Sequence, residues 1–405
     1  MRFNDDWHRT ICWIVFWRKR RIDSFSIGGT VMIQNSKVIF HIPHLAGGGA
    51  ERVAVEVARY FLSKGVLVVF FIHSEKQAYV LPEGIRVVAA RSTSHFGRLL
   101  ELRALIRSMK PAAVLSFMPY ANLISLFANI GLRNEMRLVI SEHLTVVGDH
   151  STGPMDLLKR VLRRYLYQTG DAIVAVSGGV ADDLRRTLAG RVDEKITVIY
   201  NPCFIPDETR SVGAPSRAGK TILAVGRLCD DKGFDVLLRA FAQVRLRAGG
   251  VRLVIAGEGP SRRELESLVG ELGLYDCVSL PGFTNDIRSL YRDADLFVCS
   301  SRREGFGNVI VEAMSFGLPV VATRCPHGPN EILEDGRYGH LVDVDDVRGL
   351  ADALVESLAS AGDPLMQISR AREFSLDVIG SRYLEQVGLS RFAKEELHTR
   401  TGYPT

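Results

Sequence analysis

From residue 37 almost to its end, the chain alternates short apolar runs with amphipathic stretches of helical period. Short apolar runs bounded by turn residues are typical of buried strands, and strands that alternate with helices form parallel sheets covered on both faces. The first half predicts strands at Lys37–Ile42, Val66–Ile72, Ile85–Ala89, Ala112–Phe117, Arg137–Ser141, Ala172–Val176 and Ile196–Tyr200. The second half repeats the scheme, with strands predicted at Thr221–Val225, Arg252–Ala256, Cys277–Leu280, Leu296–Cys299 and Val320–Ala322.

A length of 405 residues fits two or three domains. Pro202, Pro206 and Pro215 fall between the two strand sets and favour a linker there. The expected fold class is therefore α/β, with two doubly wound domains facing across a cleft where the carboxyl ends of both sheets bind ligands. The expected parts are a poorly ordered extension at 1–35, a first domain at 36–205, a second domain at 206–375, and a tail at 376–405 whose helix packs back on the first domain.

Composition narrows the class of protein. Hydrophobic residues make up 46% and charged residues 24%, as in globular proteins. The apolar run Ile11–Trp17 is too short for a bilayer, which needs ~20 residues, and the basic run after it makes a poor signal peptide. Six cysteines without a Cys-x-x-Cys pair favour a reducing, cytoplasmic compartment and argue against structural zinc.

Charge is distributed unevenly. Residues 1–200 carry 27 Lys and Arg against 17 Asp and Glu, a net +10, and the remainder carries −5. A basic half suits nucleic acid, anionic lipid or phosphorylated substrates, and charge alone does not choose among them. Nucleic acid is disfavoured because the basic residues are dispersed and no stacking aromatics accompany them.

Residues 155–167 predict a basic amphipathic helix. Such a helix can lie on an anionic membrane surface, which predicts peripheral association; the alternative is a helix packed on its own domain with a solvated basic edge. The expected apolar stripe is Leu158, Val161, Leu162, Tyr165 and Leu166, and its expected basic flanks are Lys159, Arg160, Arg163 and Arg164.

Gly47–Gly49 lie between a predicted strand and a predicted helix. Glycines let a ligand approach the backbone, and the helix start offers free N–H groups to an anion. The spacing is not the dinucleotide fingerprint, so a simple tight turn stays open.

Arg227 and Lys232 lie in the loop after the first strand of the second half. Two cations at a strand's carboxyl end can clamp a diphosphate and stabilise its charge as it leaves. A solvated basic loop is the alternative.

Glu304 and Glu312 flank a turn and the start of an apolar helix. The amides of Gly305–Asn308 between them predict an anion nest. Glu312 lies among apolar residues, so it needs hydrogen bonds, which a ribose could supply; a salt-bridged helix glutamate is the alternative.

Three further segments end strands at the same predicted edge. His143 ends a strand of the first half and is a candidate for the cleft, although a lone histidine is often structural. The segments around Glu258 and Phe283 can bring backbone groups to a nucleobase, or they form ordinary turns.

Together these motifs resemble the retaining GT-B glycosyltransferases of family 4 (glycosyl transferases group 1). The resemblance covers about 37–390 in the family's order and spacing. Its most specific part is the carboxylate pair with the Glu-Gly-Phe-Gly-Asn core at 304–308, and the Gly-rich turn is its weakest part. The segment 325–332 resembles members that build lipid-linked oligosaccharides or surface polysaccharides.

The resemblance implies a role for each motif. The donor's diphosphate is expected on Arg227, Lys232 and the amides of the turn. The ribose is expected on Glu312, the sugar on Glu304 and His143, and the base on the backbone of Phe283. Gly48 and Gly49 are expected to leave room for the donor phosphate and the acceptor. The implied catalytic residues are His143, Arg227, Lys232 and Glu304, and the implied donor-binding residues are Gly48, Gly49, Arg227, Lys232, Glu258, Phe283, Gly305, Phe306, Gly307, Asn308 and Glu312.

The implied function is transfer of a hexose or N-acetylhexosamine from a UDP-sugar to a glycan or lipid-linked acceptor. No cofactor and no metal are expected, because the cations at 227 and 232 replace a metal. A UDP-N-acetylhexosamine 2-epimerase shares the architecture and stays an alternative, as does a non-catalytic nucleotide-sugar-binding protein.

Overall fold

The computed structural model describes residues 36–76, 80–132, 136–143, 162–188, 192–203, 219–284, 286–360 and 362–394. The predicted extension at 1–35, most of the proline-containing linker and the end of the chain lie outside these residues.

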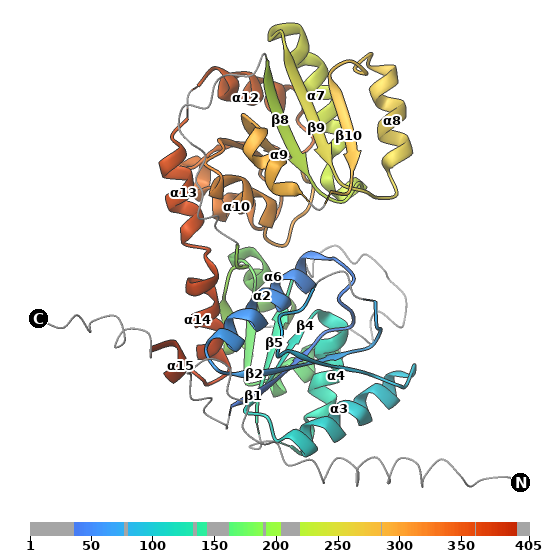
Figure 1. The fold of residues 1–405 in the computed structure, drawn as a ribbon, viewed down its shortest axis with the longest axis vertical. Coiled ribbons are helices and arrows are strands. Elements are labelled where there is room, and N and C mark those ends of the chain that lie inside the picture. The colour runs from blue at the N-terminus through green and yellow to red at the C-terminus, as the bar shows by residue number, and fades with distance from the viewer. Residues whose placement is uncertain are drawn as a thin grey trace, which may run out of the picture. The chain divides into compact units, whose positions relative to one another are not determined.

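The first half, residues 37–203, is built on a seven-stranded parallel sheet of order β3-β2-β1-β4-β5-β6-β7 (Figure 1). Its central strands are buried almost throughout, which explains their continuous apolar sequences. Helices connect most of them, as parallel pairing requires. The elements are β1 (Lys37–His41), α2 (Gly49–Ser63), β2 (Leu67–Ile72), β3 (Arg86–Ala89), α3 (His95–Met109), β4 (Ala113–Phe117), α4 (Pro119–Ala128), β5 (Arg137–Glu142), β6 (Ala172–Ala175), α6 (Gly178–Leu188) and β7 (Ile196–Val198).

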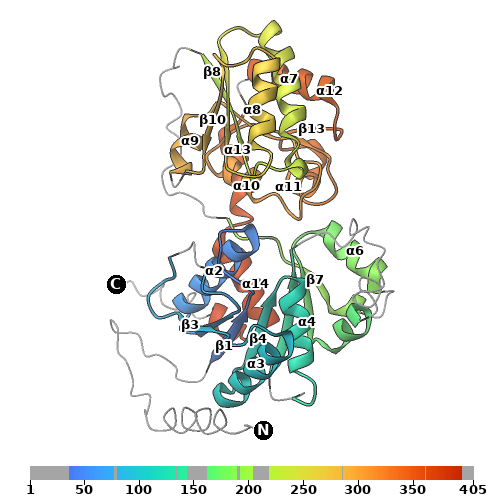
Figure 2. The same ribbon diagram turned by 90° about the vertical axis from the view of Figure 1, so that its right-hand side faces the viewer.

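The second half, residues 219–360, has a six-stranded parallel sheet of order β10-β9-β8-β11-β12-β13 (Figure 2). The elements are β8 (Lys220–Val225), α7 (Phe234–Arg247), β9 (Val251–Ala256), α8 (Arg262–Glu271), β10 (Val278–Gly282), α9 (Ile287–Asp293), β11 (Leu296–Cys299), α10 (Asn308–Ser315), β12 (Val320–Thr323), α11 (Pro329–Ile332), β13 (His340–Val342) and α12 (Val347–Ala359). The sequence did not predict β13, because this three-residue edge strand, His-Leu-Val, contains only two apolar residues.

The last helices join the two halves. These are α13 (Pro364–Arg372), α14 (Leu376–Gln386) and α15 (Arg391–Lys394). α13 packs on α10 of the second half, and α14 packs on α2 of the first. The buried Tyr383 hydroxyl lies 3.4 Å from Ser141 Oγ, and Gly380 leaves no space for a Cβ beside the Tyr60 ring. The chain therefore returns to the first half after completing the second.

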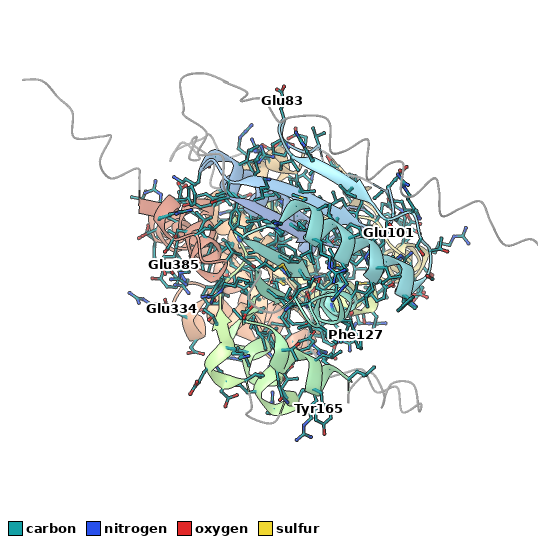
Figure 3. The ribbon with its side chains drawn as sticks, turned by 90° about the horizontal axis from the view of Figure 1, so that it is seen from below. Glu83, Glu101, Phe127, Tyr165, Glu334 and Glu385 are labelled. Atoms are coloured by element: carbon teal, nitrogen blue, oxygen red, sulfur yellow. The ribbon has the colours of Figure 1, made fainter. Side chains whose placement is uncertain are left out.

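The predicted basic helix at 155–167 is described only from Leu162 onward, and there it differs from the prediction. Arg163, expected on a basic flank, points inward and pairs with the fully buried Glu142 at 3.1 Å. Leu166 is buried, whereas Tyr165, expected beside it on the apolar stripe, is 61% exposed and projects outward (Figure 3). The described part supports the alternative of a helix packed on its own domain. No described helix is long and apolar enough to cross a membrane.

Candidate functional site

Two strand-end loops of the second half bring Lys232 and Glu304 together. Lys232 follows β8 and Glu304 follows β11, and these strands are neighbours in the sheet. Lys232 Nζ lies 2.5 Å from Glu304 Oε1, which also accepts a hydrogen bond from Ser301 Oγ at 2.7 Å. Burial lowers the pKa of Lys232, but the Glu304 carboxylate outweighs it and raises that pKa overall. The pair is therefore a charged one, partly shielded from water.

Arg302 fixes these two loops relative to each other. Its guanidinium binds both carboxylate oxygens of Asp235, at 2.9 and 2.8 Å, and also reaches Asp230 and Asp345. Its backbone N–H donates to Asp231 O at 2.7 Å. Bidentate guanidinium–carboxylate contacts are strong and directional, so the loop that carries Lys232 is tied to the loop that carries Glu304. The sequence did not indicate Arg302, because its carboxylate partners lie between 43 and 72 residues away from it in the chain.

Arg227 stands in the same β8 loop but has a different environment. Its side chain is exposed and has no partner among the described residues. A hydrogen bond from Leu228 N to Glu258 O, at 3.0 Å, joins this loop to the loop that follows β9. The Glu258 carboxylate pairs with Arg262 Nη1 at 2.5 Å, and Phe283 is 76% exposed.

The turn at 305–308 leads into α10. No backbone N–H of these four residues donates to another described residue. Gly307 has φ +101°, a conformation that glycine adopts without strain. Phe306 is buried and stacks on Tyr200, and the Asn308 side chain accepts from Asn201 Nδ2 at 2.8 Å. These amides are therefore available to a ligand, as the predicted anion nest requires.

Glu312 already has two protein partners. Arg52 Nη1 lies 2.6 Å from its Oε1, and Tyr291 OH donates to its Oε2 at 2.9 Å. The carboxylate therefore does not need a ribose to satisfy it, and the salt-bridged alternative describes this structure. Arg52 stands in the first turn of α2, directly after the Gly-rich turn, and the sequence analysis gave it no role.

His143 lies against the same turn. Its backbone O is 2.3 Å from where a Cβ on Gly305 would stand, so only glycine fits at 305 without displacement. The ring is buried, and Nε2 shares a hydrogen bond with Ser141 Oγ at 3.0 Å. Burial lowers the pKa of His143 to about 3, so the imidazole is neutral at physiological pH.

The Gly-rich turn also reaches this region. A Cβ on Gly49 would lie 3.6 Å from Asn308 Nδ2. The space at Gly48 is taken by the buried Glu51 side chain, whose carboxylate lies 3.0 Å from His44 Nδ1. Gly49 therefore lies close to the turn at 305–308, whereas the neighbour of Gly48 is a protein carboxylate.

A further contact between the halves was not predicted. Glu331 accepts from the backbone N–H groups of Gly178 and Gly179, at 2.7 and 3.0 Å, at the start of α6. His327 Nε2 lies 2.8 Å from the buried Asp183 on the same helix. Glu331 and His327 belong to the segment 325–332, whose sequence alone does not identify which residues it touches.

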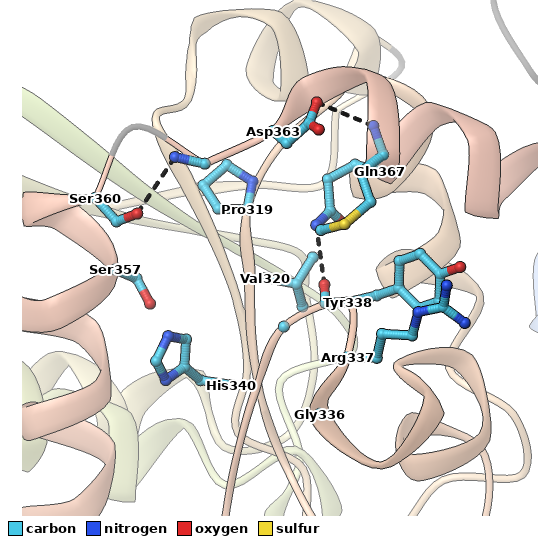
Figure 4. A pocket seen from close by; sticks show the side chains of 13 residues that line it. Pro319, Val320, Gly336, Arg337, Tyr338, His340, Ser357, Ser360, Asp363 and Gln367 are labelled. Carbon is cyan, nitrogen blue, oxygen red and sulfur yellow. Dashed lines mark hydrogen bonds between the residues drawn. The ribbon is translucent and has the colours of Figure 1, made fainter.

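A cavity of about 230 Å³ lies elsewhere, beside the amino ends of β12 and β13 (Figure 4). Its lining includes Pro319, His340, Ser357 and Gln367 but none of the predicted site residues. Within the described part of the chain, no group of three His, Cys, Asp or Glu side chains is arranged to hold a metal ion.

Comparisons with known proteins match both halves. Residues 47–203 match the model of Glycosyltransferase Family 4, and residues 219–360 match that of Glycosyl transferases group 1. The chain is similar to the N-acetylgalactosamine-N,N'-diacetylbacillosaminyl-diphospho-undecaprenol 4-α-N-acetylgalactosaminyltransferase of Campylobacter jejuni, with 29% identity over 78% of this chain and 89% of that one. It is also similar to the lipopolysaccharide core biosynthesis glycosyltransferase LpsE of Rhizobium meliloti, with 29% identity over 84% of this chain and 95% of the relative.

Solved structures share the fold. The lipopolysaccharide outer core galactosyltransferase WaaB matches with a TM-score of 0.72 and 18% identity over 87% of this chain and 99% of that chain. HepE of Anabaena, solved in complex with UDP, matches with a TM-score of 0.71 and 20% identity over the same shares. The two parallel-sheet halves therefore form the GT-B fold, as predicted.

Proposed function

Because the chain belongs to the family 4 glycosyltransferases of bacterial lipopolysaccharide and polysaccharide synthesis, we propose that it transfers a hexose or N-acetylhexosamine from a UDP-sugar to a lipid-linked glycan, retaining the anomeric configuration. The donor base follows HepE, which was solved with UDP. The acceptor class follows the Campylobacter relative, whose name includes diphospho-undecaprenol.

The observation that carries this proposal is the Lys232–Glu304 pair beside the free amides of 305–308. When the bond between the anomeric carbon and the diphosphate breaks, negative charge grows on the departing phosphate oxygen. A cation and free N–H groups placed there stabilise that charge more than they stabilise the bound donor. Arg227, which is not neutralised by any described carboxylate, adds a second cation.

Other residues position the donor in this proposal. Glu304 accepts hydrogen bonds from the sugar hydroxyls while its other contacts hold it in place. Glu312 binds the ribose from a carboxylate that Arg52 and Tyr291 already orient. The backbone at Phe283 and the loop at Glu258 contact the base. His143, neutral in its buried position, contacts the sugar, and Gly48 and Gly49 leave room for donor phosphate and acceptor.

Lys232 and Arg227 perform the charge neutralisation that a divalent metal would otherwise supply, so transfer is expected to persist in EDTA. The first half is proposed to bind the acceptor, and the protein is proposed to act in the cytoplasm, peripherally on the membrane that holds its lipid-linked acceptor.

The test is transfer of label from a panel of UDP-sugars to the organic-extractable fraction of bacterial membranes, with Glu304→Gln as control. Label that appears with one donor and is lost in the variant supports the proposal and identifies the sugar. Conversion of the donor to its 2-epimer without acceptor would indicate the epimerase instead. Binding of UDP with neither transfer nor epimerisation would indicate a non-catalytic binder.

A further inference from the structure

A cluster of basic and aromatic side chains that the site described above does not use lies at the carboxyl edge of the first sheet. His41 ends β1, His73 follows β2, and the starts of α3 and α4 supply His95, Arg98 and Tyr120. The Tyr120 hydroxyl lies 2.5 Å from His95 Nδ1 and accepts from Arg98 Nη1 at 2.9 Å. The ring of Tyr120 packs edge-on against His73, whose Nε2 lies 2.8 Å from His41 Nε2. The tyrosine therefore organises two basic side chains around one oxygen.

Arg98 is a half-buried cation with no counter-ion among the residues that the structure describes. Its described partners are the Tyr120 hydroxyl and the backbone O of Ser92, at 3.2 Å, and both are neutral. Its Nη2 has no partner among the described residues. By contrast, Arg52 and Arg163 each pair with a carboxylate. A shielded guanidinium without an anion is costly, which suggests that its counter-ion is supplied by a ligand.

The surroundings of Arg98 add positive potential. Burial lowers the pKa of His73 to about 4, and the charged groups that lower it further, Arg98, His44 and His95, are all basic. The first turn of α3 carries no acidic residue; Ser94 caps that helix, and the Glu101 carboxylate one turn further on is bound by the backbone N–H groups of Arg91 and Ser92. An anion at this edge would be attracted by the guanidinium and by the helix together.

We propose that Arg98, His95 and Tyr120 bind a phosphate or diphosphate group of the acceptor. The inference rests on the proposed function, in which the first half takes an acceptor linked to lipid. A guanidinium matches phosphate oxygens with paired N–H donors, and the hydrogen-bonded His95–Tyr120 pair adds a further donor beside it, either His95 Nε2–H or the Tyr120 O–H according to the tautomer. The same phosphate chemistry could come from a free phosphate in solution, and the two acceptor arms below distinguish these sources.

The first experiment measures binding of inorganic pyrophosphate to the full-length protein by calorimetry. Lys232→Ala removes a cation of the proposed donor site, and pyrophosphate binding should survive it. Arg98→Met, made in the Lys232→Ala background so that the proposed donor site does not mask the change, should weaken that binding at least about tenfold, the order expected for a charge-assisted contact. Arg103→Met is the matched control, because Arg103 lies on the same helix and its partners among the described residues are the backbone O atoms of Ala128 and Ile130. Binding that Arg98→Met leaves unchanged, or that Lys232→Ala abolishes, overturns the proposal.

The second experiment compares two acceptors with the same glycan, one on a lipid diphosphate and one on a neutral alkyl glycoside. Arg98→Met should raise KM for the diphosphate acceptor about tenfold and leave KM for the neutral glycoside and for the donor within about twofold. An equal rise in KM for both acceptors would overturn the proposal. A low KM for the lipid acceptor that Arg98→Met does not change would overturn it as well.

Tyr120→Phe keeps the ring and removes only the hydroxyl, so it provides a second, milder variant if Arg98→Met does not fold. It should weaken pyrophosphate binding severalfold. Pyrophosphate binding needs neither donor nor acceptor. A failure of transfer with intact, Arg98-dependent pyrophosphate binding would therefore refute the proposed function and leave the anion site standing.

Discussion

The loops at the carboxyl ends of the strands differ between the two halves in how their charged side chains are paired. In the second half, cations pair with carboxylates: Lys232 with Glu304, and Arg302 with Asp230, Asp235 and Asp345. In the first half, the corresponding edge carries buried histidines, whose lowered pKa values make them neutral, and an arginine with no described carboxylate partner. The difference shows that the Lys232–Glu304 and Arg302 clusters of the second half are pre-assembled and internally paired, whereas the Arg98 cluster of the first half has no described carboxylate partner and depends on its ligand for balance.

The largest effect is expected when the cation of the Lys232–Glu304 pair is removed. Lys232→Ala should lower kcat by about 10²–10³, because a preorganised group that stabilises developing charge contributes on that scale. The measurement is single-turnover transfer with the donor identified in the panel assay. A circular dichroism spectrum and Tm close to those of the parent are required alongside it, and turnover within twofold of the parent would refute the leaving-group role of Lys232.

A second prediction concerns the place where the two edges touch. Gly305→Ala puts a methyl group 2.3 Å from His143 O, so the turn that carries the free amides must shift. Displacements of this kind cost about 1–3 kcal/mol of stability and misalign preorganised donors, so we expect a loss of about tenfold to a hundredfold in kcat.

Gly249→Ala is the matched control for this variant, because a Cβ there meets nothing within 4 Å. It should leave both kcat and Tm unchanged. If Gly305→Ala behaved like the control, the close approach of His143 to the turn would have no bearing on transfer.

The sequence predicted most of the strands, because buried parallel strands have continuous apolar sequences. It also indicated that the segments containing Lys232 and Glu304 lie at the carboxyl ends of strands, because each comes soon after such an apolar run. It did not predict β13, whose sequence His-Leu-Val contains only two apolar residues. It also missed Arg52, Tyr291 and Arg302. Their importance comes from carboxylates far away in the chain, and no local spacing records a contact such as the one between Arg52 and Glu312. Glu312 illustrates this gap: the sequence indicated that it needs hydrogen-bond partners, but not that Arg52 and Tyr291 are two of them.

The neutral state of His143 gives the third prediction. Its pKa is about 3 in the fold against an ordinary 6.5, so the unfolded chain binds the proton more readily. Stability is therefore complete above pH 6.5 and falls as pH drops from 6.5 toward 3, by about 2 kcal/mol from this one group at pH 5.

Urea denaturation of the parent and of His143→Gln at pH 7.5 and pH 5 measures this contribution. The variant should lose about 2 kcal/mol less than the parent between the two pH values. His41 and His73 are unchanged in both proteins, so their own contributions cancel. An identical loss in parent and variant would mean that His143 is protonated in the fold, and the first edge would then not be neutral at this position.

The smallest expected effect tests how the two halves are joined. Glu331→Gln keeps the shape of the side chain but weakens the hydrogen bonds from Gly178 N and Gly179 N, because a neutral amide offers one acceptor oxygen instead of two charged ones. We expect a loss of about 1 kcal/mol in the free energy of unfolding, the usual scale of a helix N-cap, measured as a lower urea midpoint.

Glu356→Gln is the control, since that carboxylate is exposed and its nearest basic atom, His340 Nδ1, is 3.9 Å away. If Glu331→Gln lowered the urea midpoint and left KM for the donor unchanged, the contact would serve to hold the halves together. A rise in KM for the donor without a matching loss of stability would instead place Glu331 in the donor site. The comparison of charged groups in the two halves would then have to include α6.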